Sequence, residues 1–531
     1  MKRKQMIVFL IIIVLTVRIT YYFAQPDLCT DHVSQMAMAQ NFLEGHGFSF
    51  KYLDVQNQIY YKTHIQWPPL YPLIIALITL ITSNLLVSSF IIQIVVLLLL
   101  LIIWKKTFNL IKNLVSDEGY YYFIAFLIVS TSILNNINTI LVFALLLLSL
   151  SIYFIFAYLF DSKYKKINLF SATLFAVSLF WTHYSYFLVA FYPAIVLFII
   201  FYSGKNKTYL LDSLKSFIIS IVLTFGVLIY NYITTSSINY MDNPALWDAG
   251  FFPKHLLLTD PFFLNAFFKS SYIYFYILKT DQNVLLAILF QIISLIIFIG
   301  IVVLYIKLRK DKDLPSEKIF QLFIPFFVII VLTISFLLYF TLHYHEIPRP
   351  GWTHIGDPRY LSSVYISIIA IVIILLFIKA DYIKKKFLYF IKSVLVLLIF
   401  INLSINIYIT IKEWGNYSFK ADTYKVPEKD LQELYANIKF DLKRGDQPVF
   451  IDNDLTVRSF RISQYAGAAV VNSKEANKID EIPSNFVFYF ILPEEKFYRK
   501  EDFQLLGWGK KYNLKIIGTV YNNLSLYKVE K

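Results

Sequence analysis

Residues 31–48 read DHVSQMAMAQNFLEGHGF, and residues 67–77 read WPPLYPLIIAL. In the first stretch, small and apolar residues recur at helical spacing over 32–43. The run Gly45-His46-Gly47 follows, as expected where a helix ends. This pattern predicts an amphipathic helix that lies on the outer leaflet of a membrane.

The second stretch opens an apolar segment, Pro69–Thr82, that is too short for a full crossing. A transmembrane helix needs ~20 residues, and this segment has about two-thirds of that length. Trp67 suits the headgroup level, and the two prolines stiffen the entry. The segment is therefore either a crossing or a half-helix that returns to the side on which it began.

Outward from these stretches, apolar runs recur along most of the 531 residues. The chain is 58% hydrophobic and only 16% charged, whereas a soluble domain carries about 25% charged residues. About eleven membrane spans fit the sequence, at 6–24, 85–104, 117–134, 138–160, 168–182, 184–203, 213–235, 283–306, 320–342, 361–378 and 388–411. The first is interpreted as an uncleaved helix, since Arg18 interrupts a signal-peptide pattern. Cys29 is the only cysteine, which excludes an intrachain disulfide.

The distribution of basic residues decides how Pro69–Thr82 is counted. Lysine and arginine are enriched on the cytoplasmic side of membranes. If the segment is a half-helix, the inner segments hold 22 such residues and the outer loops seven. A crossing would reverse every later loop, so we expect a half-helix, an inner N-terminus and an outer tail. The net charge of +14 is thereby assigned to topology and lipid headgroups, not to nucleic acid.

The tail, residues 412–531, is richer in charge and has shorter apolar runs. Strands are predicted at 448–452, 468–471, 486–492 and 515–520, with helices at 456–466 and 499–506. We expect an all-α polytopic membrane domain over 1–411, with the half-helix and interfacial helices, and a small extracytoplasmic α/β domain over 412–531. A lid or acceptor-docking role is favoured for this α/β domain over a catalytic one.

The two opening stretches together resemble the first outer loop of the GT-C membrane glycosyltransferases. The nearest branch contains the protein O-mannosyltransferases and the aminoarabinose transferases that modify lipid A. An acidic residue after the first span, a helix ending in Gly-x-Gly and a Pro-Pro-Leu-Tyr opening carry the resemblance. It implies an enzyme that transfers a sugar, with inversion, from a polyprenyl-phosphate donor to an acceptor at the outer face.

The resemblance implies that Asp31 is the general base that takes the proton of the acceptor hydroxyl. The structural alternative is that Asp31 or Thr30 caps the helix. His32 and Trp67 lie in the same loop and are predicted to bind substrate.

The loop at 343–360, HYHEIPRPGWTHIGDPRY, supplies further candidates. The Arg359-Tyr360 pair at the start of the tenth span resembles a GT-C feature whose implied role is to bind the carrier phosphate. The alternative is an arginine that snorkels to the headgroups. Glu346, His354 and Asp357 are also predicted to bind substrate. The histidines and acids of this loop leave a divalent cation open, but we expect neither a metal site nor a cofactor.

His183 and Tyr184, where the fifth span meets the sixth, are the remaining predicted binding residues. GT-C relatives often carry Thr-Arg-Tyr where this chain has Thr-His-Tyr. A fixed cation is thus replaced by a titratable group, which predicts a weaker or pH-dependent phosphate contact. A histidine that merely caps a turn is an equal alternative. The turn at 135–138 has asparagines where many relatives have an acid, which leaves Asp31 alone.

Three rival functions remain at this stage. A transporter of lipid-linked sugar would place ionisable groups near mid-membrane, where these spans have almost none. A lipid-linked glycan polymerase or ligase would share the donor, and an inactive relative would only bind it. The expected partners are the polyprenyl-phosphate sugar, membrane lipids and an acceptor that is a lipid, glycan or protein. We expect a bacterial inner (plasma) membrane location; the sequence specifies neither sugar nor acceptor.

Overall fold

The computed structural model describes most of the chain, in two compact units. The described residues are 30–53, 58–63, 67–130, 139–161, 163–236, 261–268, 284–310, 315–343, 358–379, 385–415, 441–443, 445–452, 468–472, 485–492, 500–520 and 524–530, with single residues within 5–16 and at 438, 476, 479 and 482. The first unit holds residues 1–27, 65–70 and 89–412. The second gathers 28–64, 71–88 and 413–531, so the predicted tail shares a unit with two segments near the N-terminus.

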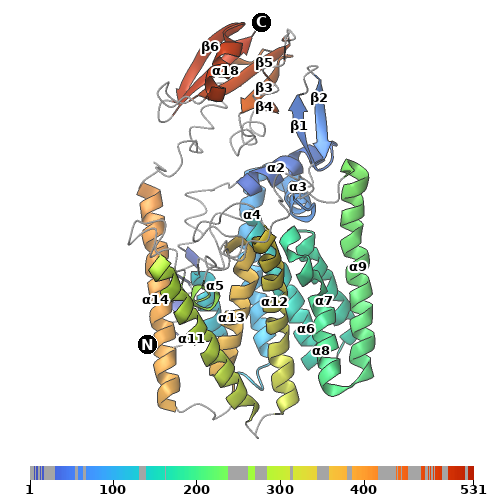
Figure 1. Cartoon of the computed structure of the whole chain (residues 1–531), viewed down its shortest axis with the longest axis vertical. Helices are drawn as coiled ribbons and strands as arrows, with labels where there is room; N and C mark the ends of the chain where they lie inside the picture. The colour runs from blue at the N-terminus through green and yellow to red at the C-terminus, as the bar shows by residue number, and fades with distance from the viewer. Residues whose placement is uncertain are drawn as a thin grey trace. The chain divides into compact units, whose positions relative to one another are not determined.

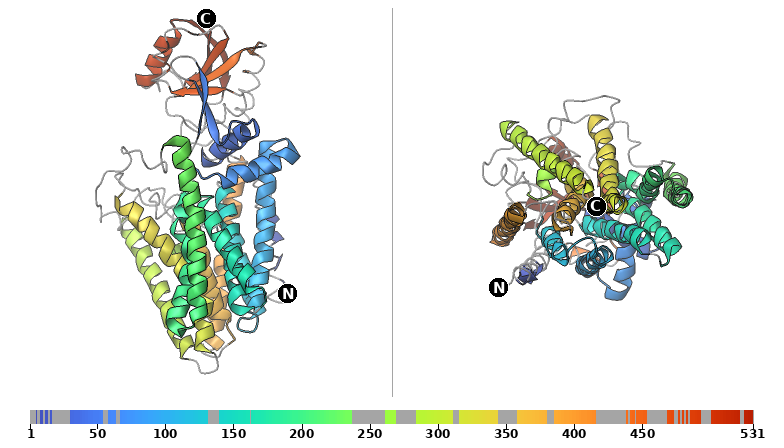
Figure 2. Two further views of the ribbon diagram at one scale, coloured as in Figure 1. Left: turned by 90° about the vertical axis from the view of Figure 1, so that its right-hand side faces the viewer. Right: turned by 90° about the horizontal axis from the view of Figure 1, so that it is seen from below.

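The first unit is a bundle of long helices that run side by side (Figure 1; Figure 2, right). In chain order its elements are α4 (Leu85–Leu110, within this unit from residue 89), α5 (Asp117–Val129), α6 (Thr139–Phe160), α7 (Lys165–Phe180), the 3₁₀ turns η1 (Tyr184–Tyr186) and η2 (Leu188–Phe191), α8 (Tyr192–Gly204), α9 (Lys207–Thr235), the short α10 (Phe262–Asn265), α11 (Val284–Arg309), α12 (Ser316–His343), α13 (Pro358–Phe377) and α14 (Lys385–Gly415).

These helices coincide with the predicted spans from 85–104 onward. Among the described helices, seven are long and apolar enough to cross a membrane, judged by length and composition. The predicted half-helix is α3 (Leu70–Thr82), a shorter apolar helix. The span predicted at 6–24 lies largely outside the described residues. The expected fold class, a helical membrane domain with a small α/β lobe, is confirmed.

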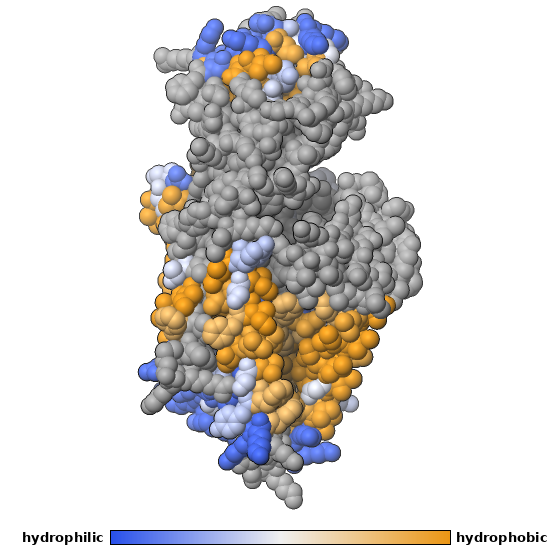
Figure 3. Space-filling view, turned by 90° about the vertical axis from the view of Figure 1, so that its left-hand side faces the viewer, coloured by the Kyte–Doolittle hydropathy of each residue, from blue (hydrophilic) through white to orange (hydrophobic). Residues whose placement is uncertain are grey.

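The surface of the helical unit is that of a protein dissolved in lipid. Figure 3 shows a broad apolar band over the helices, with hydrophilic residues at the end of the unit. Ile296 on α11 and Leu397 on α14 are 62% and 58% exposed, for example. Exposure of such apolar side chains to water is unfavourable in free energy, whereas their exposure to the hydrocarbon of a bilayer is not.

Inside the bundle, hydroxyl side chains hold α9 to its neighbours. Ser213 Oγ and Ser220 Oγ donate to the carbonyl oxygens of Ala194 and Ala190, at 2.8 and 3.0 Å. Ser216 Oγ lies 2.7 Å from Thr173 Oγ1 on α7. Small polar residues let helix backbones approach closely in a bilayer, where apolar burial alone does not drive association. This packing fixes the end of α7, from which the site described below begins.

The second unit is built on a seven-stranded sheet in the order β2-β1-β4-β3-β5-β7-β6. The strands are β1 (Ser49–Leu53), β2 (Ile59–Thr63), β3 (Gln447–Asp452), β4 (Ala469–Asn472), β5 (Phe486–Leu492), β6 (Asn513–Val520) and β7 (Leu524–Glu530), with helix α18 (Lys500–Gly509). The β1–β2 hairpin joins the sheet through a parallel pairing of Tyr52 with Val470 (Figure 2, left). A loop near the N-terminus therefore completes the C-terminal sheet.

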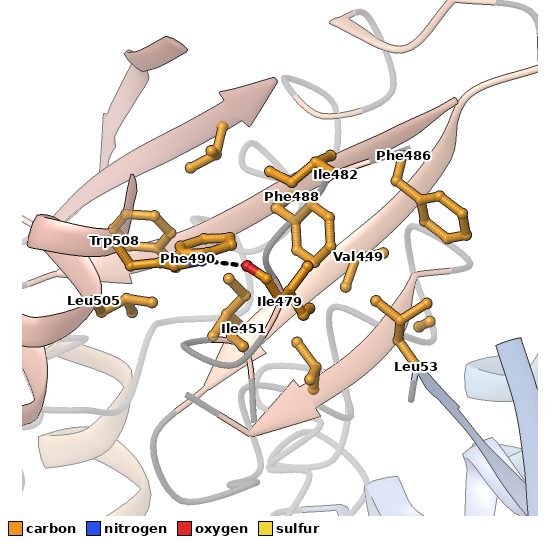
Figure 4. Packing of buried hydrophobic residues seen from close by; sticks show 14 of the residues in the cluster. Leu53, Val449, Ile451, Ile479, Ile482, Phe486, Phe488, Phe490, Leu505 and Trp508 are labelled. Carbon is orange, nitrogen blue, oxygen red and sulfur yellow. Dashed lines mark hydrogen bonds between the residues drawn. The ribbon is translucent and has the colours of Figure 1, made fainter. Parts of the chain in front are cut away.

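Side chains from both parts of the chain form the core of this sheet. Leu53 of the hairpin is buried in the same cluster as Phe488 and Trp508 (Figure 4). Trp508 Nε1 donates to the carbonyl oxygen of Ile479 at 3.3 Å, so the indole N–H is satisfied inside the core. Burial of Leu53, with Ile59 packed against the same cluster, adds a side-chain anchor to the strand pairing.

Most of the tail is as the sequence predicts. The four predicted strands are β3, β4, β5 and β6, and the predicted helix at 499–506 is α18. The helix predicted at 456–466 lies outside the described residues. The sequence analysis missed β7 and the β1–β2 hairpin. Alternation is weak in the hairpin, and its partner strand is 418 positions away.

The first outer helix, α2 (Thr30–Leu43), differs from its prediction. It occupies the expected residues, but residues 34–39 are all buried, including Ser34 and Gln35. An amphipathic surface helix would expose its polar side chains to water or headgroups. The prediction of an interfacial helix is therefore wrong for residues 34–39 of α2, which are buried in protein, whereas the end of the helix is partly exposed, with Phe42 at 38%.

Candidate active site

In the first unit, the candidate site is built on the turn between α7 and η1. The chain leaves α7 at Trp181, and the backbone N–H of His183 still donates to the carbonyl oxygen of Leu179 at 2.9 Å. His183 then caps η1: its Nδ1 accepts the backbone N–H of Ser185 at 3.2 Å. The Ser185 hydroxyl oxygen is 2.8 Å from the same nitrogen. Because Nδ1 accepts an N–H, the ring proton sits on Nε2.

The WPPL segment lies against this turn. The rings of Trp67 and His183 are 5.3 Å apart between centroids and tilted by 58°. The backbone N–H of Leu70, the first residue of α3, donates to the carbonyl oxygen of Trp181 at 3.1 Å. Trp67 and His183 are only 9% and 8% exposed. The structure thus brings together two of the predicted binding residues, from segments more than a hundred positions apart.

The following tyrosines connect the turn to α9 and α13. Tyr184 Oη accepts a hydrogen bond from Asn231 Nδ2 at 2.8 Å. Tyr186 Oη lies 3.4 Å from Ser362 Oγ, and both side chains are buried. Ser362 is one helical turn after Arg359, so the first turn of α13 starts beside the His183 turn.

In the second unit, the candidate site is the first half of α2. Asp31 and His32 lie in its first turn. The His32 ring is 1% exposed and its centroid is 6.1 Å from that of Tyr71 on α3. His32 and Gln35 are three residues apart, so they share the face of α2 that meets Tyr71.

The end of α2 is fixed by the hairpin that follows it. Gly45 and Gly47 adopt φ values of +86° and +67°, as the Gly-x-Gly ending predicted. Asn41 Nδ2 donates to the carbonyl oxygen of Ser49 at 2.7 Å, and the His46 ring stacks on Tyr61 at 3.5 Å. Because β1 continues into the lobe sheet, α2 is tied to that sheet.

Beside this junction, burial lowers the pKa of Lys51 on β1, and the carboxylate of Glu44 opposes that shift. Burial also raises the pKa of Tyr61, which pairs with Lys51 across the hairpin, and Glu44 adds to that rise.

Several predicted residues are placed only in part. Asp31, Arg359 and Tyr360 are described as helical backbone, in the first turns of α2 and α13. Glu346, His354 and Asp357 lie outside the described residues. The asparagine turn at 135–138 also lies outside them, and the next described residue is Thr139, where α6 begins. Within the described part of the chain, no three His, Cys, Asp or Glu side chains gather as metal ligands would.

Two residues that sequence reasoning missed belong to this geometry. Ser185 holds the His183 ring, and its signal was the His-x-Ser spacing of a side chain that caps a turn. Gln35 lies four residues after Asp31 on α2 and is fully buried. The sequence already showed that Gln35 follows the candidate base Asp31 by one helical turn. The prediction of an amphipathic surface helix, however, implied that Gln35 is exposed to solvent.

Comparison with known proteins identifies this architecture. Neither a protein-family model nor a curated protein matches the sequence. Among solved structures, ArnT from Cupriavidus metallidurans bound to undecaprenyl phosphate is similar, with a TM-score of 0.57 and 9% identity. The match covers 99% of this chain and 98% of that one. ArnT in the apo state gives a TM-score of 0.56 over the same shares, again at 9% identity. The likeness shows a shared fold along the whole chain and confirms the fold that the sequence resemblance implied.

Proposed function

From the GT-C fold of this chain, we propose that it is a glycosyltransferase that uses a polyprenyl-phosphate-linked sugar. The sugar passes, with inversion, to an acceptor at the outer face of the membrane. The observation that carries the proposal is the match over 99% of this chain to an ArnT structure bound to undecaprenyl phosphate. We further propose an inner-membrane location with a cytoplasmic N-terminus, from the basic residues of the expected inner loops.

The reaction needs a base and a cradle for the leaving phosphate. An acceptor hydroxyl attacks the anomeric carbon, and the bond from that carbon to the phosphate oxygen breaks. The phosphate leaves with the electron pair, and Asp31 takes the hydroxyl proton. A positioned carboxylate contributes typically 10²–10⁴-fold in rate at such a step. The helical start at Thr30 gives Asp31 a defined backbone position for that role.

The donor phosphate is assigned to Arg359 and His183. Arg359 lies in the first turn of α13, where unpaired backbone N–H groups add to the attraction for an anion. The contact between Tyr186 and Ser362 fixes that turn beside His183. His183 offers a hydrogen-bond donor at Nε2, and the buried Trp67 indole excludes water next to it. Tyr184, Tyr360, His32, Glu346, His354 and Asp357 are the further residues that we propose to bind substrate.

The test is transfer by the full chain in proteoliposomes. Undecaprenyl-phosphate sugars serve as donors, and Asp31→Asn is compared with the wild type. We expect kcat to fall at least about 100-fold, because the acceptor proton loses its base. Asp117→Asn is the matched control, since Asp117 is an exposed aspartate in the first turn of another helix, α5. Full turnover by Asp31→Asn would remove Asp31 from the mechanism, and no transfer by the wild type from any donor would overturn the function.

A further inference from the structure

Gln35 combines complete burial with an unbonded amide. Its side chain is 0% exposed, and neither Nε2 nor Oε1 has a hydrogen-bond partner among the residues that the structure describes. At Gln93, by contrast, Oε1 alone is a buried side-chain atom without a partner among the described residues. Buried polar groups are almost always bonded, and those that are not tend to mark sites of function. A buried amide without a hydrogen-bond partner in the protein is a candidate to bond a bound ligand.

The position of Gln35 on α2 indicates where a ligand of its amide would lie. Asp31 and Gln35 are four residues apart, so their positions are stacked one turn apart on α2. His32, three residues before Gln35, packs against Tyr71 of α3. Gln35 therefore belongs to the face that carries the proposed base and meets α3. Its Cβ direction leans toward the first turn, where Asp31 lies.

The chemistry of a primary amide narrows the choice of ligand. It presents a donor and an acceptor about two ångströms apart and carries no charge. A phosphate would use the donor and leave the carbonyl unbonded, and an apolar chain would use neither. A hydroxyl group, which both donates and accepts, satisfies it, and neighbouring hydroxyls of a sugar satisfy both of its ends.

We propose that the Gln35 amide binds a carbohydrate hydroxyl of the substrate, next to the reacting centre. This inference rests on the proposed transferase function, and it makes Gln35 a determinant of which sugar is accepted. Sites built to bond a hydroxyl reject analogues that lack it far more strongly than apolar pockets discriminate by size. The hydroxyl belongs either to the transferred sugar or to the acceptor, and the test separates the two.

The informative variant is Gln35→Met, which keeps the length of the side chain and removes both polar atoms. An unbonded amide does not stabilise the free protein, so the unliganded Tm should stay equal or rise. Gln40→Met is the matched control. Gln40 lies on the same helix, but its amide bonds Glu44 at the surface at 3.0 Å.

Binding is measured by the rise in Tm of the purified full chain with four additions. These are undecaprenyl phosphate alone, undecaprenyl-phosphate glucose, undecaprenyl-phosphate mannose, and methyl glycosides of the same sugars. Gln35→Met should respond to undecaprenyl phosphate as the wild type does. Its response to the donor sugars or to the methyl glycosides should be lost, with a fall of about 10-fold or more in kcat/KM for transfer. Loss with the donors assigns the hydroxyl to the donor sugar, and loss with the glycosides assigns it to the acceptor.

Two results would overturn the inference. One is an unliganded Tm for Gln35→Met that falls by several degrees while every ligand response is retained, which makes the amide structural. The other is an equal response of Gln35→Met and wild type to every sugar that stabilises the wild type. If the wild type transfers no sugar, the proposed transferase function fails. The inference on Gln35 is still tested, because the change in Tm with added sugar measures binding and not transfer.

Discussion

His183 Nδ1 accepts the backbone N–H of Ser185 at 3.2 Å, which fixes this histidine as a donor through Nε2. The sequence suggested a titratable cation where GT-C relatives carry an arginine. The turn uses Nδ1 as an acceptor, which leaves Nε2 as the ring nitrogen that can donate. Under the proposed function, a single imidazole N–H binds a phosphate oxygen more weakly than the fork of a guanidinium, so we expect Arg359 to contribute more to donor binding than His183.

Replacing His183 with asparagine separates its two roles. The Asn Oδ1 can still accept the Ser185 N–H, as asparagine does at helix starts, so the turn should persist. The Nε2 donor is lost, and we expect the donor KM to rise about 10–100-fold, in line with one lost hydrogen bond to a charged group. Steady-state transfer with varied donor concentration measures this. An unchanged KM would leave His183 with a capping role only.

Arg359 should matter through geometry as well as charge. We expect Arg359→Ala to lower kcat/KM about 10–100-fold, and Arg359→Lys to recover only part of the loss, because lysine cannot bond a phosphate in the bidentate way. Donor titrations with purified protein measure both variants. Arg309→Ala, at an exposed helix end on α11, is the control and should behave as the wild type. Equal activity of all three would make Arg359 a membrane anchor.

Lys528 holds two carboxylates in the lobe. Its Nζ lies 2.7 Å from Asp441 Oδ2 and 2.9 Å from Glu530 Oε2, and the residue is 6% exposed. The carboxylates left behind are 24% and 35% exposed and can be hydrated, so we expect Lys528→Met to cost about 1–3 kcal/mol and to lower the Tm. Lys515→Met, on the neighbouring strand and exposed, should change it little. Calorimetry of the full chain compares them, and an equal Tm for both variants would show that the pairs contribute nothing.

The same cluster predicts loss of stability in alkali. Burial acts to lower the pKa of Lys528, but the bonds to Asp441 and Glu530 outweigh it and raise the pKa above 10.5. A raised folded pKa gives stability that is complete below the unfolded value and is lost as the pH rises through the folded one. The lobe should therefore weaken above about pH 10.5. A Tm that is flat from pH 9 to 12 would contradict the pairing.

Leu53 should control how firmly the hairpin is held. Leu53→Ala empties part of the lobe core, and large-to-small changes of this kind cost about 2–5 kcal/mol. Hydrogen exchange of β1 and β2 should speed up, while exchange in β5, which lies between β3 and β7 inside the sheet, stays slow. Val87→Ala is a control, because Val87 is 45% exposed on α4. Uniform slow exchange in Leu53→Ala would mean that the hairpin stays docked by its backbone alone.

The membrane helices were predictable from the sequence because the lipid around them requires long apolar stretches. A helix in lipid must be apolar for about twenty residues, and that length leaves a plain trace in the sequence. The half-helix reading of Pro69–Thr82 gains support from the sheet. Tyr52 pairs with Val470, so both lie on one side of the membrane, and an even number of crossings must separate them. Counting α3 as a further span alongside the ten predicted from 85 to 411 would make that number odd.

The lobe and the site were predictable only in part. Strand β5 is an unbroken apolar run and is therefore easy to predict as a buried strand. Strand β1 carries Lys51 and two aromatic residues, and its partner strand β4 is distant in the sequence, so no local pattern predicts the pairing. His183, Trp67 and the start of α13 were predicted one by one, from motifs. Their mutual contacts depend on hydrogen bonds such as Leu70 N–H to the Trp181 carbonyl, which no local pattern encodes.

The docking of β1 beside β4 also sets an order of events during synthesis. The hairpin emerges early, yet the strand it must join is made 418 residues later, after the predicted spans from 85 to 411 have been inserted. Until then its edge is open, and open edges pair with whatever strand is near. Lys51, the charged residue of β1 itself, lies on the strand whose edge is open and opposes such pairing in the unfinished chain. A truncated chain that stops before residue 469 would expose this edge permanently, so degradation or aggregation is its expected fate in the cell.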